Sequence, residues 1–397
     1  MAVVKRERFE IMKTLYIHIG TPKTGTTSLQ HFCTENAQLF EEKGYSYPIF
    51  PHKFKYINIM RNGYFLSYKG YDENRNRDLM DEEKFFRQGM DFVLDNFKKT
   101  DNIILSDESI WNVVFKRGKP DLWERLRKEA DAHGYVIKVI VYLRRQDSLA
   151  TSWWNQKIKI GKRVYSKASW EKFVSDPTRL ELNYYEPLKI IEKSVGKENM
   201  IIRRFGKQYF KNGSIFEDFI DAVGMKYSSR FVISEGQRNV SLVGNAHEIK
   251  RILNAIPDLS DQNNTFFRRI VIAMSEQRAD LKSETMFSAE EALEFMEQYR
   301  EGNRKIMQEY FGKDEDLFDM DFSKNKKWVL DHKEMEKDII RFMGRAIIEL
   351  RRENKELKKR VKATEIELSE QREMIRDIQA KLDNPVKTVL SSIKKKR

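Results

Sequence analysis

The sequence predicts an α/β protein in which helices flank a parallel β-sheet and a long C-terminal coiled-coil helix follows. Three observations predict this. Short apolar runs rich in β-branched residues alternate with amphipathic segments. A loop rich in glycine and threonine joins the first run to the first amphipathic segment, and a heptad pattern begins at Ile340. With 397 residues, the chain can bury a large core and form two or three domains.

The apolar runs are expected to be buried parallel strands, because alternation with helices builds βαβ units. They are Thr14–Ile19, Ile103–Ser106, Val136–Leu143 and Met200–Arg203. Helices are expected near Ser28–Lys43, Glu82–Lys98, Asp121–His133 and Asp147–Lys159, then around Ser214–Val223, Val243–Ala255 and Ala289–Tyr310. The aromatic and basic stretch Tyr45–Tyr71 has no clear period and is either a long functional loop or a core segment.

The loop after the first expected strand has the layout of an anion cradle. Backbone N–H groups of such a loop curl around a phosphate-like group, and the N-terminus of the following helix adds partial positive charge. Gly20 and Gly25 have the spacing that opens a nucleotide-binding P-loop, but Thr26 and Thr27 stand where that motif needs Lys followed by Ser or Thr. The lysine of the loop comes earlier, at Lys23.

This loop resembles the phosphosulfate-binding loop of sulfotransferases that use 3′-phosphoadenosine 5′-phosphosulfate. The matching residues are Pro22, Lys23, Thr24, Gly25, Thr26 and Thr27. The resemblance implies a P-loop NTPase-like sulfotransferase fold, in which Lys23 contacts the bridging oxygen and the sulfuryl group. It also implies that the backbone of Thr24, Gly25, Thr26, Thr27 and Ser28 holds the donor. A fixed ammonium group would stabilise the charge that develops on the leaving phosphate.

A second motif resembles the site for the 3′-phosphate in the same family. The expected strand Val136–Leu143 ends at Arg144, and Ser152 follows eight residues later. The resemblance implies that Arg144 and Ser152 bind the 3′-phosphate of the donor, with Arg145 as the alternative if the register shifts by one. Gln146 departs from the proline often found there. Arginine suits this role because its planar fork matches phosphate oxygens.

The segment after Ile103–Ser106 has two interpretations. As an apolar strand ending in Asp107-Glu108, it resembles the strand of nucleotide hydrolases that ends in a magnesium-binding carboxylate. It also resembles the Ser-x-Glu-Ser segment of bacterial and heparan-type sulfotransferases, which implies that Glu108 is the general base for the acceptor hydroxyl. His18 and His31 are the alternative bases, although His18 lies inside a strand and is expected in the core.

A later segment, Arg238-Asn-Val-Ser-Leu242, resembles an Asn-x-Ser segment of bacterial sulfotransferases. By that resemblance Arg238 is a further phosphate ligand; a plain loop before a helix is the alternative. Trp153 and Trp154 either line the acceptor cleft or enter the core, and at least one is expected in the core.

Together these residues predict a sulfotransferase domain over 12–330. The expected reaction moves a sulfuryl group from 3′-phosphoadenosine 5′-phosphosulfate to an acceptor hydroxyl without a metal, and the resemblance favours a carbohydrate or glycolipid acceptor. Two other classes stay open. One is a P-loop kinase or NTPase, and the other is a non-catalytic coiled-coil scaffold with a degenerate nucleotide-binding domain.

The C-terminal part changes character at Ile340. Apolar residues follow a 3-4 spacing for about six heptads, or roughly 65 Å of helix, and Asn354 falls at an a position. We expect a coiled coil over 335–384 that forms a parallel homodimer, since a buried asparagine pair favours that register. The alternative is a long helix packed on its own domain. The basic tail 385–397 is expected to be a frayed terminus, with weak contact to an anionic membrane surface as the alternative.

Composition narrows the remaining classes. The net charge of +13 is dispersed among 61 acidic residues and accompanies no nucleic-acid motif, so a nucleic-acid partner is not expected. Cys33 is the single cysteine and is expected in the core, and no run of apolar residues reaches transmembrane length. A cytoplasmic enzyme is the expectation.

Overall fold

The computed structural model describes residues 12–74, 76–114, 119, 121–161, 164–176, 181–234, 240–278, 280–281, 284–383 and 386. Its strands are β1 (Lys13–His18), β2 (Tyr45–Ser46), β3 (Gly70–Tyr71), β4 (Arg77–Asp78), β5 (Asn102–Ser106), β6 (Tyr135–Arg144), β7 (Met200–Phe205), β8 (Glu284–Thr285) and β9 (Lys326–Lys327). The α-helices are α1 (Thr26–Glu35), α2 (Ala37–Glu42), α3 (Tyr64–Ser67), α4 (Leu79–Asn96), α5 (Leu122–His133), α6 (Gln146–Ile160), α7 (Trp170–Val174), α8 (Tyr185–Val195), α9 (Ile215–Ala222), α10 (Ala246–Leu253), α11 (Asp261–Glu276), α12 (Ala289–Phe311) and α13 (His332–Asp383). Short 3₁₀ helices are η1 (Glu108–Val114), η2 (Val164–Lys167), η3 (Lys197–Asn199) and η4 (Lys211–Gly213).

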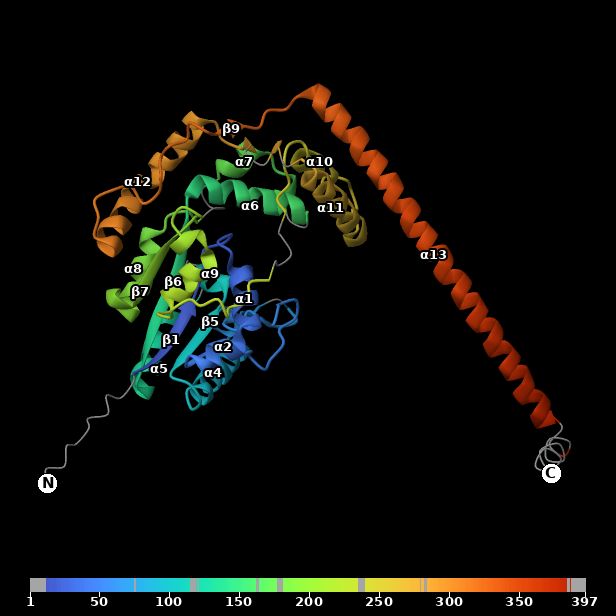
Figure 1. Cartoon of the computed structure of the whole chain (residues 1–397), viewed down its shortest axis with the longest axis horizontal. Coiled ribbons are helices and arrows are strands. Elements are labelled where there is room, and N and C mark those ends of the chain that lie inside the picture. Colours follow the sequence, from blue (N-terminus) through green and yellow to red (C-terminus); the bar gives the residue numbers. More distant parts are fainter. Residues whose placement is uncertain are drawn as a thin grey trace.

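The central sheet has the order β2-β5-β1-β6-β7, and all neighbouring strands are parallel. The predicted parallel sheet is therefore confirmed, with all four expected strands in it (Figure 1). The edge strand β2 was not predicted, because two residues are too short to show a period. The small strands β3 and β4 form a separate antiparallel pair.

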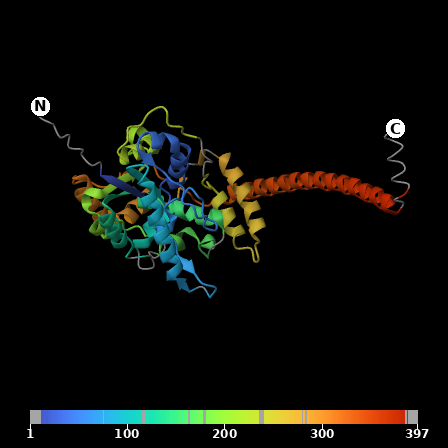
Figure 2. The ribbon, with the colours of Figure 1, turned by 90° about the horizontal axis from the view of Figure 1, so that it is seen from below.

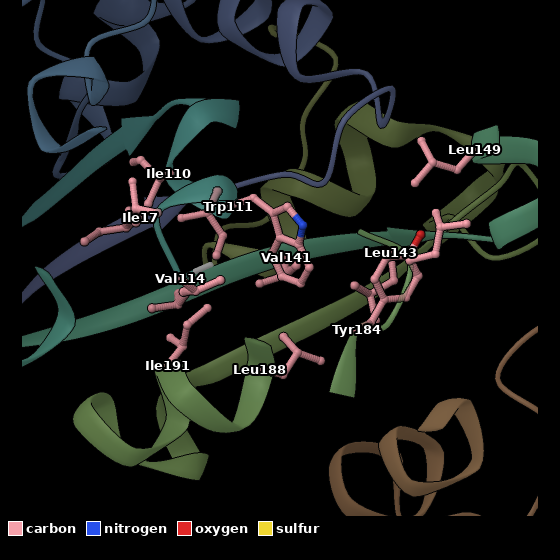
Figure 3. Packing of buried hydrophobic residues seen from close by; sticks show 14 of the residues in the cluster. Ile17, Ile110, Trp111, Val114, Val141, Leu143, Leu149, Tyr184, Leu188 and Ile191 are labelled. Atoms are coloured by element: carbon pink, nitrogen blue, oxygen red, sulfur yellow. The ribbon is translucent and has the colours of Figure 1, made fainter. Parts of the chain in front are cut away.

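Helices cover both faces of the sheet. Successive side chains of a strand point in opposite directions, so each strand contributes to two apolar clusters. Leu15, Ile17 and Val141 belong to the larger apolar cluster, whereas Tyr16 and Ile140 belong to a second one. Helices α4, α5 and α8 contribute to the larger cluster, and α1, α2 and α9 to the second. Figure 3 shows the larger cluster, with residues of η1 and α8 packed against the sheet.

The strand order reverses at β1, between its neighbours β5 and β6. From β1 the chain runs to β2 and β5 on one side of β1, then crosses to β6 on the other. Ligands of open α/β sheets bind where the strand order reverses in this way. The loop after β1, η1 after β5 and the arginines after β6 all lie at this edge.

One predicted helix was wrong. The expected helix Ser28–Lys43 is split into α1 and α2 at Asn36. The Asn36 side chain donates to the Phe32 carbonyl and pairs in both directions with the backbone of Val232, at 2.8 Å each. This contact to a residue 196 positions away outweighs local helix propensity, which is a weak preference.

The stretch 45–71 is divided between core and surface. Phe50, Phe54 and Phe65 are buried in the larger apolar cluster. Tyr56 is 92 % exposed, so only part of the stretch is free to meet a ligand. Aromatic residues without a period gave no sign of this, because the segment folds through a short helix and turns.

The predicted long C-terminal helix is confirmed as α13, which extends away from the rest of the molecule (Figures 1 and 2). Its first turns contact α11, and Arg269 of α11 forms an ion pair with Glu353 at 2.5 Å. From residue 354 to 380 every residue of α13 is exposed, so the part of the helix beyond the Glu353 ion pair does not pack on its own domain. None of the helices in the described ranges is long and apolar enough to cross a membrane.

Candidate active site

The loop between β1 and α1 has a backbone conformation that is typical of anion-binding loops. Gly25 caps α1 in the left-handed conformation (φ 76°), and Lys23 is also left-handed (φ 66°). Alternation of left-handed residues with others turns backbone N–H groups toward one side and forms an anion-binding nest. A Cβ at Gly20 would lie only 2.6 Å from Thr26 Oγ1, so glycine is required there for close packing.

Hydrogen bonds from its own threonines hold the loop in place. Thr24 Oγ1 donates to the Thr21 carbonyl at 2.6 Å, and Thr21 Oγ1 donates to the Tyr142 carbonyl of β6 at 2.8 Å. Both threonine side chains are buried. Thr26 Oγ1 is buried as well and has no partner among the described residues. The loop is therefore tied to the neighbouring strand and keeps one hydroxyl for a ligand oxygen.

Lys23 lies over the loop in a partly buried position. Its Nζ donates to Gln156 Oε1 of α6 at 3.4 Å. Burial lowers the pKa of Lys23, and the positive charge of Arg144 lowers it further. An ammonium group held beside a second cation and away from water interacts strongly with an incoming anion.

Arg144, at the end of β6, is bonded to the same loop. Its Nη1 donates to the Lys23 carbonyl at 2.8 Å, and its Nε and Nη2 donate to Ser148 Oγ at 3.0 and 2.8 Å. Tyr184 donates to the Arg144 carbonyl at 2.7 Å. Burial lowers the pKa of Arg144. The structure thus joins two residues that are 121 positions apart in the chain.

Ser152 lies on the same face of α6 as the serine that Arg144 contacts. Ser148, Ser152 and Gln156 are spaced by four residues, which places them in a row along one side of a helix. Ser148 at one end of this row contacts Arg144, and Gln156 at the other end contacts Lys23. Ser148 and Gln156 were missed from the sequence, although the four-residue spacing of polar side chains after Arg144 was a usable signal.

Arg145 and the two tryptophans have other roles. Arg145 forms a two-pronged ion pair with Asp147 at 2.7 and 2.9 Å, so its guanidinium is already occupied. Trp154 is buried in the larger apolar cluster, as expected for one tryptophan of the pair. Trp153 is half-buried and lies under Lys157, whose Nζ is 4.2 Å from the ring centre.

Glu108 opens η1, directly after β5. Its Oε1 lies 3.4 Å from Arg61 Nη1. Its Oε2 is buried and has no hydrogen-bond partner among the described residues. A carboxylate oxygen that no protein group binds can accept a proton or a hydroxyl hydrogen bond from a ligand.

Asp107, beside it, is occupied by protein donors. Arg61 donates to both Asp107 oxygens at 2.7 and 3.1 Å, and the Ser109 backbone N–H and Ser67 Oγ donate at 2.8 and 3.3 Å. Burial raises the pKa of this fully buried carboxyl, and Arg61 opposes the rise. Arg61 was missed from the sequence, because its link to Asp107 spans 46 residues.

The two histidines differ in environment. His18 is fully buried in β1, and its Nδ1 is 2.9 Å from Ser106 Oγ, as expected of a core residue. Burial lowers the pKa of His18 to about 3, so the ring is neutral. His31 is exposed on α1. Arg238 lies outside the described residues.

A third cation, also missed from the sequence, lies close to the loop. Lys159 of α6 is buried, and its Nζ donates to the Val240 carbonyl at 3.0 Å. Burial lowers its pKa to about 8, and the positive charges of Lys23 and Arg268 contribute. Lys23, Arg144 and Lys159 therefore place three cationic side chains near the loop, which suits an anionic ligand.

Comparisons with known proteins add limited information. No family model matches the chain. An uncharacterized protein of Archaeoglobus fulgidus is 28 % identical over 179 residues, which is 45 % of this chain and 46 % of that protein. The chain therefore matches about half the length of this relative. Among solved structures, a sulfotransferase from Alicyclobacillus acidocaldarius covers 66 % of this chain and 94 % of its own, at 15 % identity and a TM-score of 0.34. A similarity of this strength assigns no activity to the chain.

Proposed function

We propose that this protein transfers a sulfuryl group from 3′-phosphoadenosine 5′-phosphosulfate to a hydroxyl of a carbohydrate or glycolipid acceptor. One observation carries the proposal. Three neighbouring strands bring three groups to one edge of the sheet: the loop with Lys23, the guanidinium of Arg144 and the carboxylate of Glu108. One oxygen of that carboxylate has no hydrogen-bond partner among the described residues.

Two cationic side chains, Lys23 and Arg144, support a donor with phosphate at both ends of its ribose. Lys23 and the loop would hold the 5′-phosphosulfate, and Arg144 with Ser152 the 3′-phosphate. The direct bond from Arg144 to the Lys23 carbonyl keeps the two sites at a fixed spacing. In this proposal the bond between Arg144 and Ser148 opens to admit phosphate oxygens. Arg238 remains a proposed further ligand of that phosphate.

The chemistry is an in-line displacement. The acceptor oxygen attacks sulfur, the bond from sulfur to the bridging oxygen breaks, and its electron pair stays on adenosine 3′,5′-bisphosphate. Lys23 stabilises that developing charge. The hydroxyl proton passes to Glu108, whose free Oε2 is the acceptor. Arg61 orients Glu108 through Oε1.

A kinase or NTPase is the rival enzyme. It would need Asp107 as a magnesium ligand, but the four donors described above already surround that carboxylate. The lysine of the loop also stands before Gly25 rather than after it. Both observations favour the sulfuryl donor over ATP.

The test is a calorimetric titration of the whole chain. Adenosine 3′,5′-bisphosphate should bind without magnesium and at least about tenfold more tightly than ATP with magnesium. Lys23→Ala should weaken this binding, whereas the control Lys43→Ala, an exposed lysine beyond α2, should not. Tighter binding of ATP would support the kinase, and binding of neither nucleotide would support the scaffold.

A further inference from the structure

The far part of α13 carries an apolar face that its own domain does not cover. The a and d positions of the heptads from residue 350 on are at least 48 % exposed wherever they are apolar: Leu350, Leu357, Val361, Leu368, Ile375, Ile378 and Leu382. A single stripe of this kind is stable in water only when another surface covers it. The stripe follows a 3.5-residue period, which matches a second helix in a coiled coil.

The charges beside the stripe identify the second helix. In a parallel, in-register pair, each g residue faces the e residue five positions later in the other helix. With Ile347, Asn354 and Val361 at a positions, the g residues are Glu353, Arg360 and Glu367 and the e residues Lys358, Glu365 and Arg372. Each of the three g-to-e′ contacts then joins opposite charges. Glu353 also pairs with Arg269 of its own domain, so Arg360 and Glu367 carry the argument. Asn354 pairs with its own copy only in this register.

From this complementarity we infer that α13 of a second copy of this chain covers the stripe, in parallel and in register. Both domains then lie at the same end of the coil, since each is joined to its N-terminal end. The inference is independent of the reaction proposed above, because it uses no residue of the sheet edge.

Sedimentation of the full chain tests the partner. A particle of twice the 47.4 kDa chain mass is expected. Charge reversal tests the pairing: Arg360→Glu with Glu367→Lys makes two g-to-e′ contacts repulsive and should raise the dissociation constant at least about tenfold. Adding Glu365→Arg and Arg372→Glu should restore it. The control Lys359→Glu with Glu373→Lys changes the same charges on the outer face and should have no effect.

Disulfide trapping tests the orientation. Leu357→Cys places two thiols side by side only in a parallel, in-register pair, so oxidation should link the two chains. Ser369→Cys, on the outer face, should not link them. A monomer at all concentrations, an unchanged dimer after charge reversal, or a dimer that Leu357→Cys fails to link would each overturn the inference. None of these substitutions touches the domain, so a folding failure is not expected.

Discussion

Removal of Arg61 should show how much this arginine stabilises the neighbouring carboxylates Asp107 and Glu108 at the edge of the sheet. Arg61 donates two hydrogen bonds to the fully buried Asp107 and lies 3.4 Å from Glu108. In Arg61→Gln the charge of Asp107 loses its counter-charge, and the shorter amide cannot reproduce the two-pronged contact. The remaining donors, from Ser109 and Ser67, are neutral.

The expected cost is about 3 kcal/mol of unfolding free energy, since breaking one partner of a buried ion pair costs about 3–5 kcal/mol. The lower end applies because Ser109 and Ser67 still donate to the carboxylate. Urea titration of the folded protein measures the change. The control Arg127→Gln, which breaks the exposed pair with Asp131, should cost less than about 1 kcal/mol.

The loss should also depend on pH. Burial already raises the pKa of Asp107, and removal of Arg61 raises it further. Between the unfolded and the folded pKa, the folded protein then binds more protons than the unfolded chain, so stability falls as pH rises. The deficit of Arg61→Gln should therefore be larger at about pH 8 than at about pH 5.

A second substitution makes the reasoning refutable. Arg61→Gln with Asp107→Asn removes both charges and should recover much of the stability and abolish the added pH dependence. If Arg61→Gln costs less than about 1 kcal/mol, or if Asp107→Asn restores nothing, the buried pair is not what stabilises this edge.

Three further predictions follow from the same geometry. Arg144→Ala should strongly weaken the binding of adenosine 3′,5′-bisphosphate and hardly affect the binding of 5′-AMP, as measured by calorimetry. Equal losses of affinity would contradict the 3′-phosphate assignment. Glu108→Gln should lower sulfuryl transfer by about 10²–10⁴-fold while bisphosphate affinity stays unchanged, because a lost general base affects only the chemical step; full activity in the variant would exclude that role. Trp154→Ala should cost about 3–5 kcal/mol of unfolding free energy, and Trp153→Ala should cost less because that side chain is only half-buried; similar losses would refute the difference in packing.

Much of the fold was accessible from local pattern. The strand runs and the loop from Gly20 to Gly25 depend on residues within a few positions of each other, so periodicity and turn chemistry reveal them. The break at Asn36 was missed because its partner, Val232, is distant in sequence. No local pattern encodes such a contact.

The candidate site divides in the same way. The sequence predicted that Lys23, Arg144 and Glu108 lie at one edge of the sheet, because each follows an apolar run and parallel strands end at one edge. Arg61 was not predicted, because its role depends on a distant residue that the fold brings beside it. Gln156 was missed although its four-residue spacing from Ser148 and Ser152 was a usable signal.

The sequence by itself determined the alternation that makes a parallel sheet, the cradle after its first strand and the heptad stripe of α13. Only the tertiary structure decided that Arg144 contacts the loop backbone and Ser148, that Asp107 is occupied by Arg61, and that the far part of α13 leaves its own domain. The reason is physical. Propensity and periodicity act over a few residues, whereas the pairing of a buried charge depends on which distant segments the fold brings together.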